Sequence, residues 1–157
     1  EHYFKLEKEN QLLREQVERL KSDAERKYLP TLAELLDRLS INQIKEVKIP
    51  DHKEEYAQEI QDIMHDIDLI LSENKVAFDA KMLRDLIILA QYNHHIWVNE
   101  AEARKGGKDG NNLYLSHGLN SIRNNAKNRI QGKIGGRKDY KLDVIDVFSE
   151  WVPSDYA

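Results

Sequence analysis

The first 27 residues carry a heptad pattern of apolar positions. Leu6, Leu13 and Leu20 recur at intervals of seven residues. The alternate positions of the pattern hold Tyr3, Asn10, Val17 and Ala24. Apolar residues at a and d, with leucine at d, are typical of a parallel two-stranded coiled coil, and one asparagine at a fixes register at some cost in stability. We therefore predict a parallel homodimer through residues 3–27, with an interface of Leu6, Asn10, Leu13, Val17 and Leu20.

The flanking charges agree with this pairing, but the shortness of the pattern leaves an alternative open. Glu9 at position g can meet Arg14 at position e of a parallel partner. The pattern lasts about three and a half heptads, which is near the lower limit for recognising a coiled coil. The alternative is a single amphipathic helix that packs on its own domain.

Helical signals continue along the rest of the chain. Thr31 is a suitable N-cap for a helix over 32–41, and the apolar positions up to Ile49 either extend that helix or form a short extended piece. Further helices are expected over about 54–72, about 80–104 with Asp79 as N-cap, and about 112–133. The third of these four helices should bury Leu83, Leu86, Ile87, Ala90, Trp97 and Ala101, and the fourth Leu115, Leu119, Ile122, Ala126 and Ile130.

The C-terminal residues change to a different pattern. Tyr140, Leu142 and Val144 alternate with polar residues and predict a short strand or an extended arm. Phe148, Trp151 and Val152 are expected to dock on a surface. We thus predict an all-α fold: a parallel coiled coil over 1–27, then an antiparallel helical bundle over 28–157 with a short extended C-terminal arm from about 137.

Composition restricts the class of protein. Of the 157 residues, 33% are charged, and the net charge of −4 argues against nonspecific nucleic-acid binding as the main task. The chain has no cysteine, which excludes disulfides, a thiolate nucleophile and cysteine-based zinc sites. No apolar run has the length of a membrane span and no signal peptide is visible, so we expect a cytoplasmic protein without a membrane partner.

Polar side chains lie along the third body helix on the side expected to face the core. His94 falls near the middle of that face, and its flank holds Asn93, Trp97, Glu100 and Arg104. The fourth helix carries a similar stripe with Asn120, Arg123 and Lys127, one of whose cations could meet Glu100. Buried polar groups need partners. One interpretation is a structural ion-pair and amide network; the other is a pocket for a small anionic or sugar-like ligand.

A second candidate site is acidic. The helix over 54–72 holds Glu59, Asp62, His65 and Asp66, and hard oxygen ligands of this kind suit Mg²⁺. Asp62 and His65 point away from the apolar stripe, which favours a solvated face. All-α nucleotide pyrophosphohydrolases hold Mg²⁺ with two carboxylate pairs, and Glu59-Ile-Gln-Asp62 resembles one pair, whereas Glu100 with Glu102 replaces the other poorly. Outside this alternative we expect no cofactor and no catalytic residue.

Two stretches resemble known kinds of sequence. The segment Leu6-Glu-Lys-Glu-Asn-Gln-Leu-Leu-Arg-Glu-Gln-Val-Glu-Arg-Leu-Lys21 resembles the zippers of bZIP transcription factors, over about 25 residues. Such factors place a basic helix directly before the zipper. The sequence opens Glu1-His2-Tyr3-Phe4 instead, without an initiator Met. The resemblance implies a DNA-binding dimer that lacks its basic region, or a zipper grafted onto this body rather than native to it.

The body resembles small uncharacterised helical proteins of bacteria and their phages. The residues that carry this resemblance are Pro30-Thr-Leu-Ala-Glu-Leu-Leu-Asp-Arg-Leu-Ser-Ile41, Asn93-His-His-Ile-Trp-Val-Asn-Glu100 with Arg104, and Asn120-Ser-Ile-Arg-Asn-Asn-Ala-Lys-Asn128. It covers roughly 100 residues and implies no particular activity. The sequence therefore predicts a homo-oligomeric binding or assembly protein without enzymatic activity, with a magnesium-dependent nucleotide hydrolase and a DNA-binding dimer as the alternatives.

Overall fold

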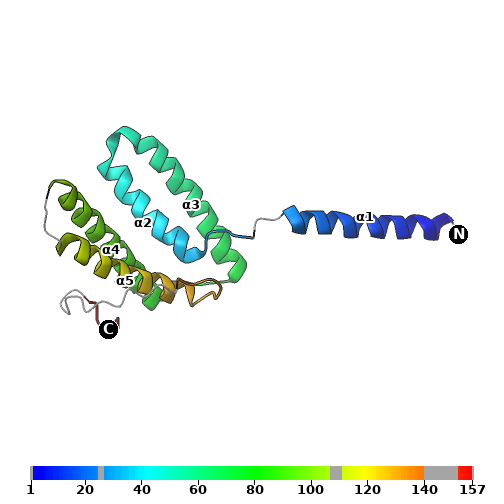
Figure 1. Cartoon of the computed structure of the whole chain (residues 1–157). Helices are drawn as coiled ribbons and strands as arrows, with labels where there is room; N and C mark the ends of the chain where they lie inside the picture. The colour runs from blue at the N-terminus through cyan, green and yellow to red at the C-terminus, as the bar shows by residue number, and fades with distance from the viewer. Residues whose placement is uncertain (1, 25–26, 107–110, 140–151, 157) are drawn as a thin grey trace.

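The computed structural model describes residues 2–24, 27–106, 111–139 and 152–156. Every regular element in these ranges is a helix, so the all-α prediction is confirmed for the described chain. In chain order the elements are α1 (His2–Ala24), α2 (Leu32–Lys48), the 3-10 helix η1 (Pro50–His52), α3 (Lys53–Asn74), α4 (Ala80–Arg104) and α5 (Asn111–Gln131) (Figure 1). None of the described helices is long and apolar enough to cross a lipid bilayer.

Helix α1 stands apart from the other described helices (Figure 1). It is rich in Leu, Glu, Lys and Arg and contains neither Gly nor Pro, a composition with high helix propensity. None of its residues is buried, and no contact joins it to another described helix. It therefore does not pack on its own domain, which was the alternative to the zipper. Its pairing with a second chain stays a prediction.

Helix α2 begins at a capping box. The Thr31 hydroxyl accepts a hydrogen bond from Glu34 N at 3.3 Å, and the Glu34 carboxylate accepts one from Thr31 N at 2.8 Å. The helix continues to Lys48, so Ile44 and Val47 extend it and do not form a separate extended piece. Pro50 then begins η1. Proline lacks a backbone N–H, but the first position of a helix does not need one. The next helix, α3, ends at Asn74, and the capping residue Lys75 adopts the left-handed conformation with φ 52°.

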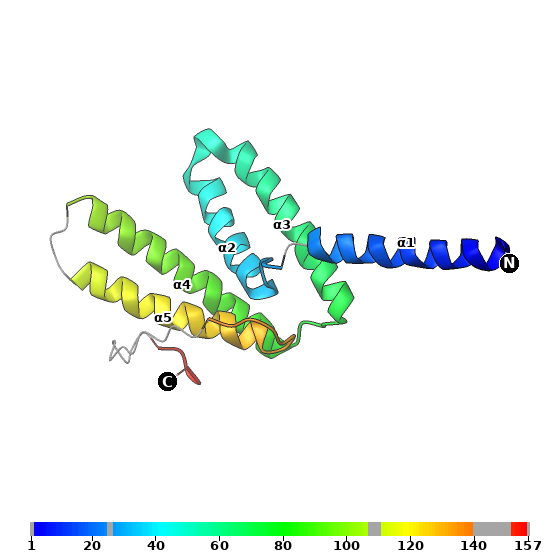
Figure 2. The same ribbon diagram turned by 45° about the vertical axis from the view of Figure 1, so that its right-hand side comes forward.

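The body consists of two helix pairs. α2 packs on α3 and α4 packs on α5, while α2 also contacts α4 and α5. The backbones of α3 and α4 do not approach each other, and the two helices diverge in Figure 2. The shared core is apolar and includes Leu32, Leu36, Ile67, Met82, Leu89, Tyr92, Leu119, Ala126 and Ile130. The predicted buried face of α5 is confirmed, with Leu115 partly buried and Leu119, Ile122, Ala126 and Ile130 buried.

The predicted core face of α4 is displaced by about one residue, although Leu86 is partly buried against the core as predicted. Asp79 caps this helix as expected, by accepting a hydrogen bond from Met82 N at 2.8 Å. The residues that α4 buries are Met82, Asp85, Ile88, Leu89, Tyr92, Asn93 and Ile96. Leu83, Ile87 and Ala90 are exposed instead. The run over residues 86–90 is apolar all around the helix, so its periodicity does not fix which face turns inward.

Asp85 lies on the buried face of α4 and has a partner far along the chain. Asp85 is 2% exposed, and its carboxylate accepts a hydrogen bond of 2.5 Å from the hydroxyl of Tyr156, a residue that is also buried. A buried carboxyl requires such a donor. Val152 also packs against the core, as expected. The rest of the predicted C-terminal arm, including Tyr140, Leu142, Val144, Phe148 and Trp151, lies outside the described residues.

Candidate anion-binding site

Three helices meet in a polar cluster around Asp37 of α2. Asn93 of α4 donates a hydrogen bond from Nδ2 to Asp37 Oδ1 at 2.8 Å, and Ser40 Oγ lies 3.3 Å from the same nitrogen. From α5, Arg123 Nη1 and Lys127 Nζ lie 3.8 and 3.7 Å from Asp37 Oδ2. Arg123 Nη1 also donates to Asn93 Oδ1 at 3.4 Å. We call Asp37, Ser40, Asn93, Arg123 and Lys127 the Asp37 cluster.

The Asp37 cluster is mostly removed from solvent and its charges do not balance. The exposed fractions of the side chains are 12% for Asp37, 23% for Arg123 and 14% for Lys127. One carboxylate therefore faces two cations. In addition, Arg123 Nε is buried and has no hydrogen-bond partner among the described residues. A partly buried excess positive charge is unfavourable by itself and favours a nearby anion.

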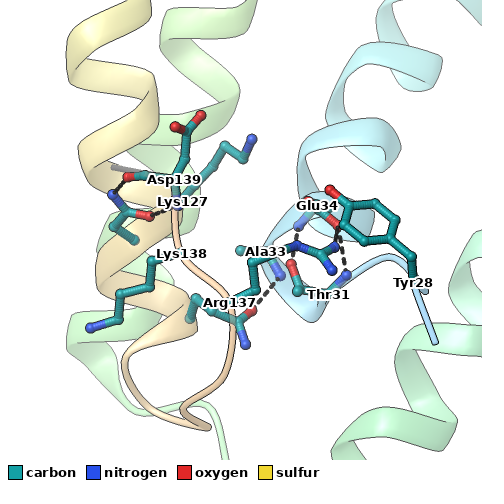
Figure 3. A pocket seen from close by; sticks show the side chains of 10 residues that line it. Tyr28, Thr31, Ala33, Glu34, Lys127, Arg137, Lys138 and Asp139 are labelled. Atoms are coloured by element: carbon teal, nitrogen blue, oxygen red, sulfur yellow. Dashed lines mark hydrogen bonds and ion pairs between the residues drawn. The ribbon is translucent and has the colours of Figure 1, made fainter. Parts of the chain in front are cut away.

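A pocket adjoins the cluster and shares Lys127 with it. This α2–α5 pocket has a volume of about 290 Å³ and lies between the start of α2, the end of α5 and the following segment (Figure 3). Its lining residues are Tyr28, Thr31, Ala33, Glu34, Lys127, Asn128, Gln131, Arg137, Lys138 and Asp139. Together the cluster and the pocket hold four cations, Arg123, Lys127, Arg137 and Lys138, and three carboxylates, Glu34, Asp37 and Asp139.

Side-chain hydrogen bonds fix the walls of the α2–α5 pocket. Gln131 Oε1 accepts from Ala33 N at 3.2 Å, and Gln131 Nε2 donates to Gly135 O at 2.6 Å. Asn128 Oδ1 accepts from Asp139 N at 3.0 Å. The end of α5 is thus tied both to the start of α2 and to the segment that follows it. The pocket is held open by contacts within the body itself.

Arg137 forms one side of the pocket. Its guanidinium lies 3.9 Å from the centre of the Tyr28 ring, and its Nη2 lies 2.7 Å from Glu34 Oε2 (Figure 3). Burial raises the pKa of Glu34, but the hydrogen bonds from Thr31 N and Arg137, with the nearby charge of Lys127, outweigh burial and leave the pKa below its usual value. Lys127 therefore acts electrostatically on the pocket as well as on Asp37.

The structure brings together some of the sequence-predicted ligand residues and separates others. Asn93, Arg123 and Lys127 lie in one cluster, as expected, and Asn120 is half-buried on the same helix as the two cations. Trp97 is half-buried on α4. His94, Glu100 and Arg104 were expected on the core-facing side of α4 and are exposed instead. Glu100 meets neither Arg123 nor Lys127, and pairs at 3.5 Å with Arg104.

Asp37 was missed by sequence reasoning. Asp37 lies between Leu36 and Leu39 on an amphipathic helix, where a charged side chain is ordinarily solvated. A signal did exist, because Ala33, Asp37 and Ser40 are spaced by four and three residues and so form a stripe of small or polar residues beside the apolar face. Glu34 and Arg137 were missed because their contact joins positions 103 residues apart.

The acidic residues of α3 do not converge. Glu59, Asp62 and Asp66 are all exposed. Glu59 accepts a hydrogen bond from Asn42, Asp62 one from Gln58, and Asp66 lies 3.3 Å from the neighbouring His65. Over the described part of the chain, no three histidine or acidic side chains are grouped as metal ligands would be. The magnesium alternative therefore gains no support from the geometry of this helix.

Comparisons with known proteins leave the site to be interpreted from its own chemistry. No protein-family model, no curated protein and no solved structure matches the chain.

Proposed function

We propose that this protein is a non-enzymatic, homo-oligomeric helical binding and assembly protein. In this proposal α1 pairs with α1 of a second copy as a parallel coiled coil. The α2–α5 pocket of each body takes a small anionic or sugar-like ligand, held chiefly by Lys127 and Arg137. The other members of the Asp37 cluster lie behind Lys127, and Asp37 positions it.

The unbalanced charge beside the pocket carries the ligand part of the proposal. Lys127 is shared between Asp37 and the pocket, and Asp37 must also neutralise Arg123. An anion in the pocket would take up the excess charge in a site where screening by water is limited. A phosphate or carboxylate suits this position because a guanidinium and an ammonium both form charge-assisted hydrogen bonds with such groups.

The uncharged lining accounts for a sugar-like component. Thr31, Asn128 and Gln131 supply a hydroxyl and two amides around the pocket, and the Tyr28 ring supplies an aromatic surface. Ligand pockets commonly combine apolar surface with a few positioned polar groups. A small polyol that carries a phosphate or a carboxylate combines both requirements.

The exposed apolar residues of α1 support the part of the proposal that concerns assembly. Leu6, Leu13, Val17 and Leu20 are between 47% and 68% exposed on a helix that packs on no other described helix. A helix of 23 residues with an exposed leucine seam is stabilised when the seam is buried against a second helix. Two copies of α1 provide that cover for each other.

The ligand proposal is tested by calorimetric titration of the full chain with inorganic phosphate, glucose 6-phosphate and glucose. We expect the two phosphates to bind and glucose to bind more weakly. Lys127→Gln should weaken phosphate binding by about tenfold, as expected for loss of one charge-assisted contact. Lys81→Gln, on an exposed position of α4 outside the pocket, should leave it unchanged. Absence of phosphate binding, or equal weakening by both variants, would overturn the proposal.

A further inference from the structure

One guanidinium connects the α2–α5 pocket with the part of the chain that leads to α1. Arg137 lines the pocket, and its Nη2 donates a hydrogen bond to Leu29 O at 3.0 Å. The same nitrogen lies 2.7 Å from Glu34 Oε2, and Cζ lies over the Tyr28 ring, 3.9 Å from its centre (Figure 3). We call Tyr28 and Leu29 the Tyr28 segment. Only residues 25–27 separate it from the end of α1.

The backbone of Arg137 is fixed from the other side, by α5. Gly135 and Gly136 directly precede it and adopt positive φ values of 83° and 92°, a conformation that other residues rarely adopt. Gln131, the last residue of α5, donates a hydrogen bond to Gly135 O at 2.6 Å. The contact of Arg137 with Leu29 spans 108 residues of sequence. Arg137 thus bridges the end of α5 and the Tyr28 segment beside the pocket.

The guanidinium of Arg137 still has N–H groups to offer a ligand. A guanidinium carries five N–H donors in one rigid plane. Nη2 donates to Leu29 and Glu34, whereas Nε and Nη1 make no hydrogen bond to a described residue. An anion that accepts from Nε or Nη1 leaves both contacts of Nη2 in place. The anion and the Tyr28 segment therefore hold the guanidinium in the same position and do not compete for it.

We propose that the Tyr28 segment is part of the anion site: it positions Arg137 for the ligand, and a bound anion in turn holds the segment on the body. The inference rests on the proposed anion site and connects that site to α1. Such a coupling is reciprocal. The factor by which the held segment raises the affinity for the anion equals the factor by which the anion favours the held segment. An anion in the pocket thus fixes the point at which the chain leaves the body toward α1.

The exposure of the Tyr28 segment leaves it responsive to the ligand. Tyr28 is 71% exposed and Leu29 52%, and neither side chain belongs to the hydrophobic core. A segment with few buried apolar contacts opens locally at low cost. A cation–π contact at an exposed site changes an equilibrium by about two- to fivefold. We therefore expect the coupling between the anion and the segment to be about threefold.

Calorimetric titration of the full chain with inorganic phosphate tests the positioning role of Tyr28. Tyr28→Ala should weaken phosphate binding about threefold, because the ring no longer holds the guanidinium. Tyr28→Phe is the matched control: it keeps the ring and should bind as the unchanged chain does. In the Arg137→Gln variant, the further change Tyr28→Ala should have no additional effect, because Tyr28 acts through Arg137.

Trypsin cleavage after Lys27 measures the segment itself, since the protease must take up Tyr28 and Leu29 beyond the cleaved bond. Cleavage of this kind depends on the population of the opened segment. Saturating phosphate should slow cleavage after Lys27 about threefold, relative to sodium chloride at equal ionic strength, the same factor as in the titration. Cleavage after Lys105, which is exposed at the end of α4, should proceed at the same rate in both salts.

The outcomes separate this inference from the proposed function. Phosphate binding that Tyr28→Ala leaves unchanged, or that does not slow cleavage after Lys27, overturns the coupling and leaves the anion site standing. Faster cleavage after Lys27 in phosphate also overturns it, because the anion then displaces the segment. Absence of phosphate binding overturns both. Weaker binding in Tyr28→Ala but not in Tyr28→Phe, together with slower cleavage after Lys27 in phosphate, supports the coupling.

Discussion

The side-chain amide of Asn93 donates a hydrogen bond of 2.8 Å to Asp37, and this bond joins α4 to α2 inside the body. Asp37 also faces Arg123 and Lys127 of α5. One carboxylate thus connects three helices and sets the position of the lysine that lines the pocket. The stability of the body and the binding of an anion are therefore coupled through Asp37.

Replacement of Asp37 should be strongly destabilising. Asp37→Ala leaves the mostly buried Arg123 and Lys127 without their carboxylate, and loss of one partner of a buried ion pair costs about 3–5 kcal/mol. The free energy of unfolding in urea measures this effect. Glu100→Ala is the control, because Glu100 pairs with Arg104 at the surface and should change stability by less than about 0.5 kcal/mol. Equal effects of the two changes would contradict the assignment of Asp37 as the centre of the cluster.

Removal of the Tyr156 hydroxyl should loosen the C-terminal residues from α4. Tyr156→Phe deprives the buried Asp85 of its donor, which costs about 1–3 kcal/mol. Arg84 also contacts this segment, through Ser154 and Asp155, so the C-terminus should remain close to α4. Urea unfolding and amide hydrogen exchange of residues 152–156 measure the two effects. An unchanged free energy of unfolding would mean that the Asp85–Tyr156 contact does not hold the chain end.

The same contact predicts a loss of stability in alkali. Burial and the hydrogen bond to Asp85 raise the pKa of Tyr156 above its usual value of 10.0. The folded protein therefore holds this proton more tightly than the unfolded chain does. The resulting stabilisation is complete below about pH 10 and is lost as the pH rises further. Burial also raises the pKa of Tyr92. The free energy of unfolding should fall as the pH rises above about 10, and more shallowly in Tyr156→Phe; identical slopes would contradict the shift.

The lowered pKa of Glu34 predicts that stability falls in acid, whereas the raised pKa of Tyr156 predicts that it falls in alkali. Because the pKa of Glu34 is lowered in the folded protein, the unfolded chain binds the proton more readily, and the stabilisation is lost as the pH falls below about 4.5. The carboxyl carbon of Glu34, followed by NMR, should titrate below 4.5. Arg137→Gln removes one cause and should move the midpoint upward. A midpoint at or above 4.5 in the unchanged chain would contradict the described contacts.

Replacement of Asn10 should change the stability and the oligomeric state of the assembly. Asn10→Val places an apolar side chain at an a position, so the dimer should become more stable while the choice of oligomer becomes less strict. Sedimentation equilibrium over a range of concentrations measures both quantities. If neither the dissociation constant nor the distribution of oligomers changed, Asn10 would not lie in an interface.

Local signals allowed most helices to be predicted from the sequence. Thr31 and Glu34 form a capping box within four residues, and Asp79 caps α4 through Met82, so both starts were readable. Which face of α4 is buried could not be predicted from the sequence. The buried face includes Asp85, whose hydrogen-bond partner Tyr156 lies 71 residues away. Distant partners of this kind leave no trace in local periodicity.

The candidate site, too, was predicted only in part from the sequence. Arg123 and Lys127 were identified as cations on the inner flank of α5, which depends only on helix periodicity. Their partner was predicted to be Glu100 and is Asp37, because pairing between helices depends on how α2 crosses α4 and α5. The pocket itself arises from the segment over 137–139 folding back toward Glu34, and this return was beyond sequence reasoning.

Native mass spectrometry of the full chain tests the central claim most directly. At micromolar concentration the unchanged chain should have the mass of two copies, and Leu13→Glu should have the mass of one, because Leu13 occupies a d position. Leu12→Glu is the matched control: Leu12 is 61% exposed and Leu13 57%, but Leu12 lies outside the a/d seam and its replacement should preserve the dimer. A single-copy mass for the unchanged chain, or a dimer that survives Leu13→Glu, would contradict assembly through α1.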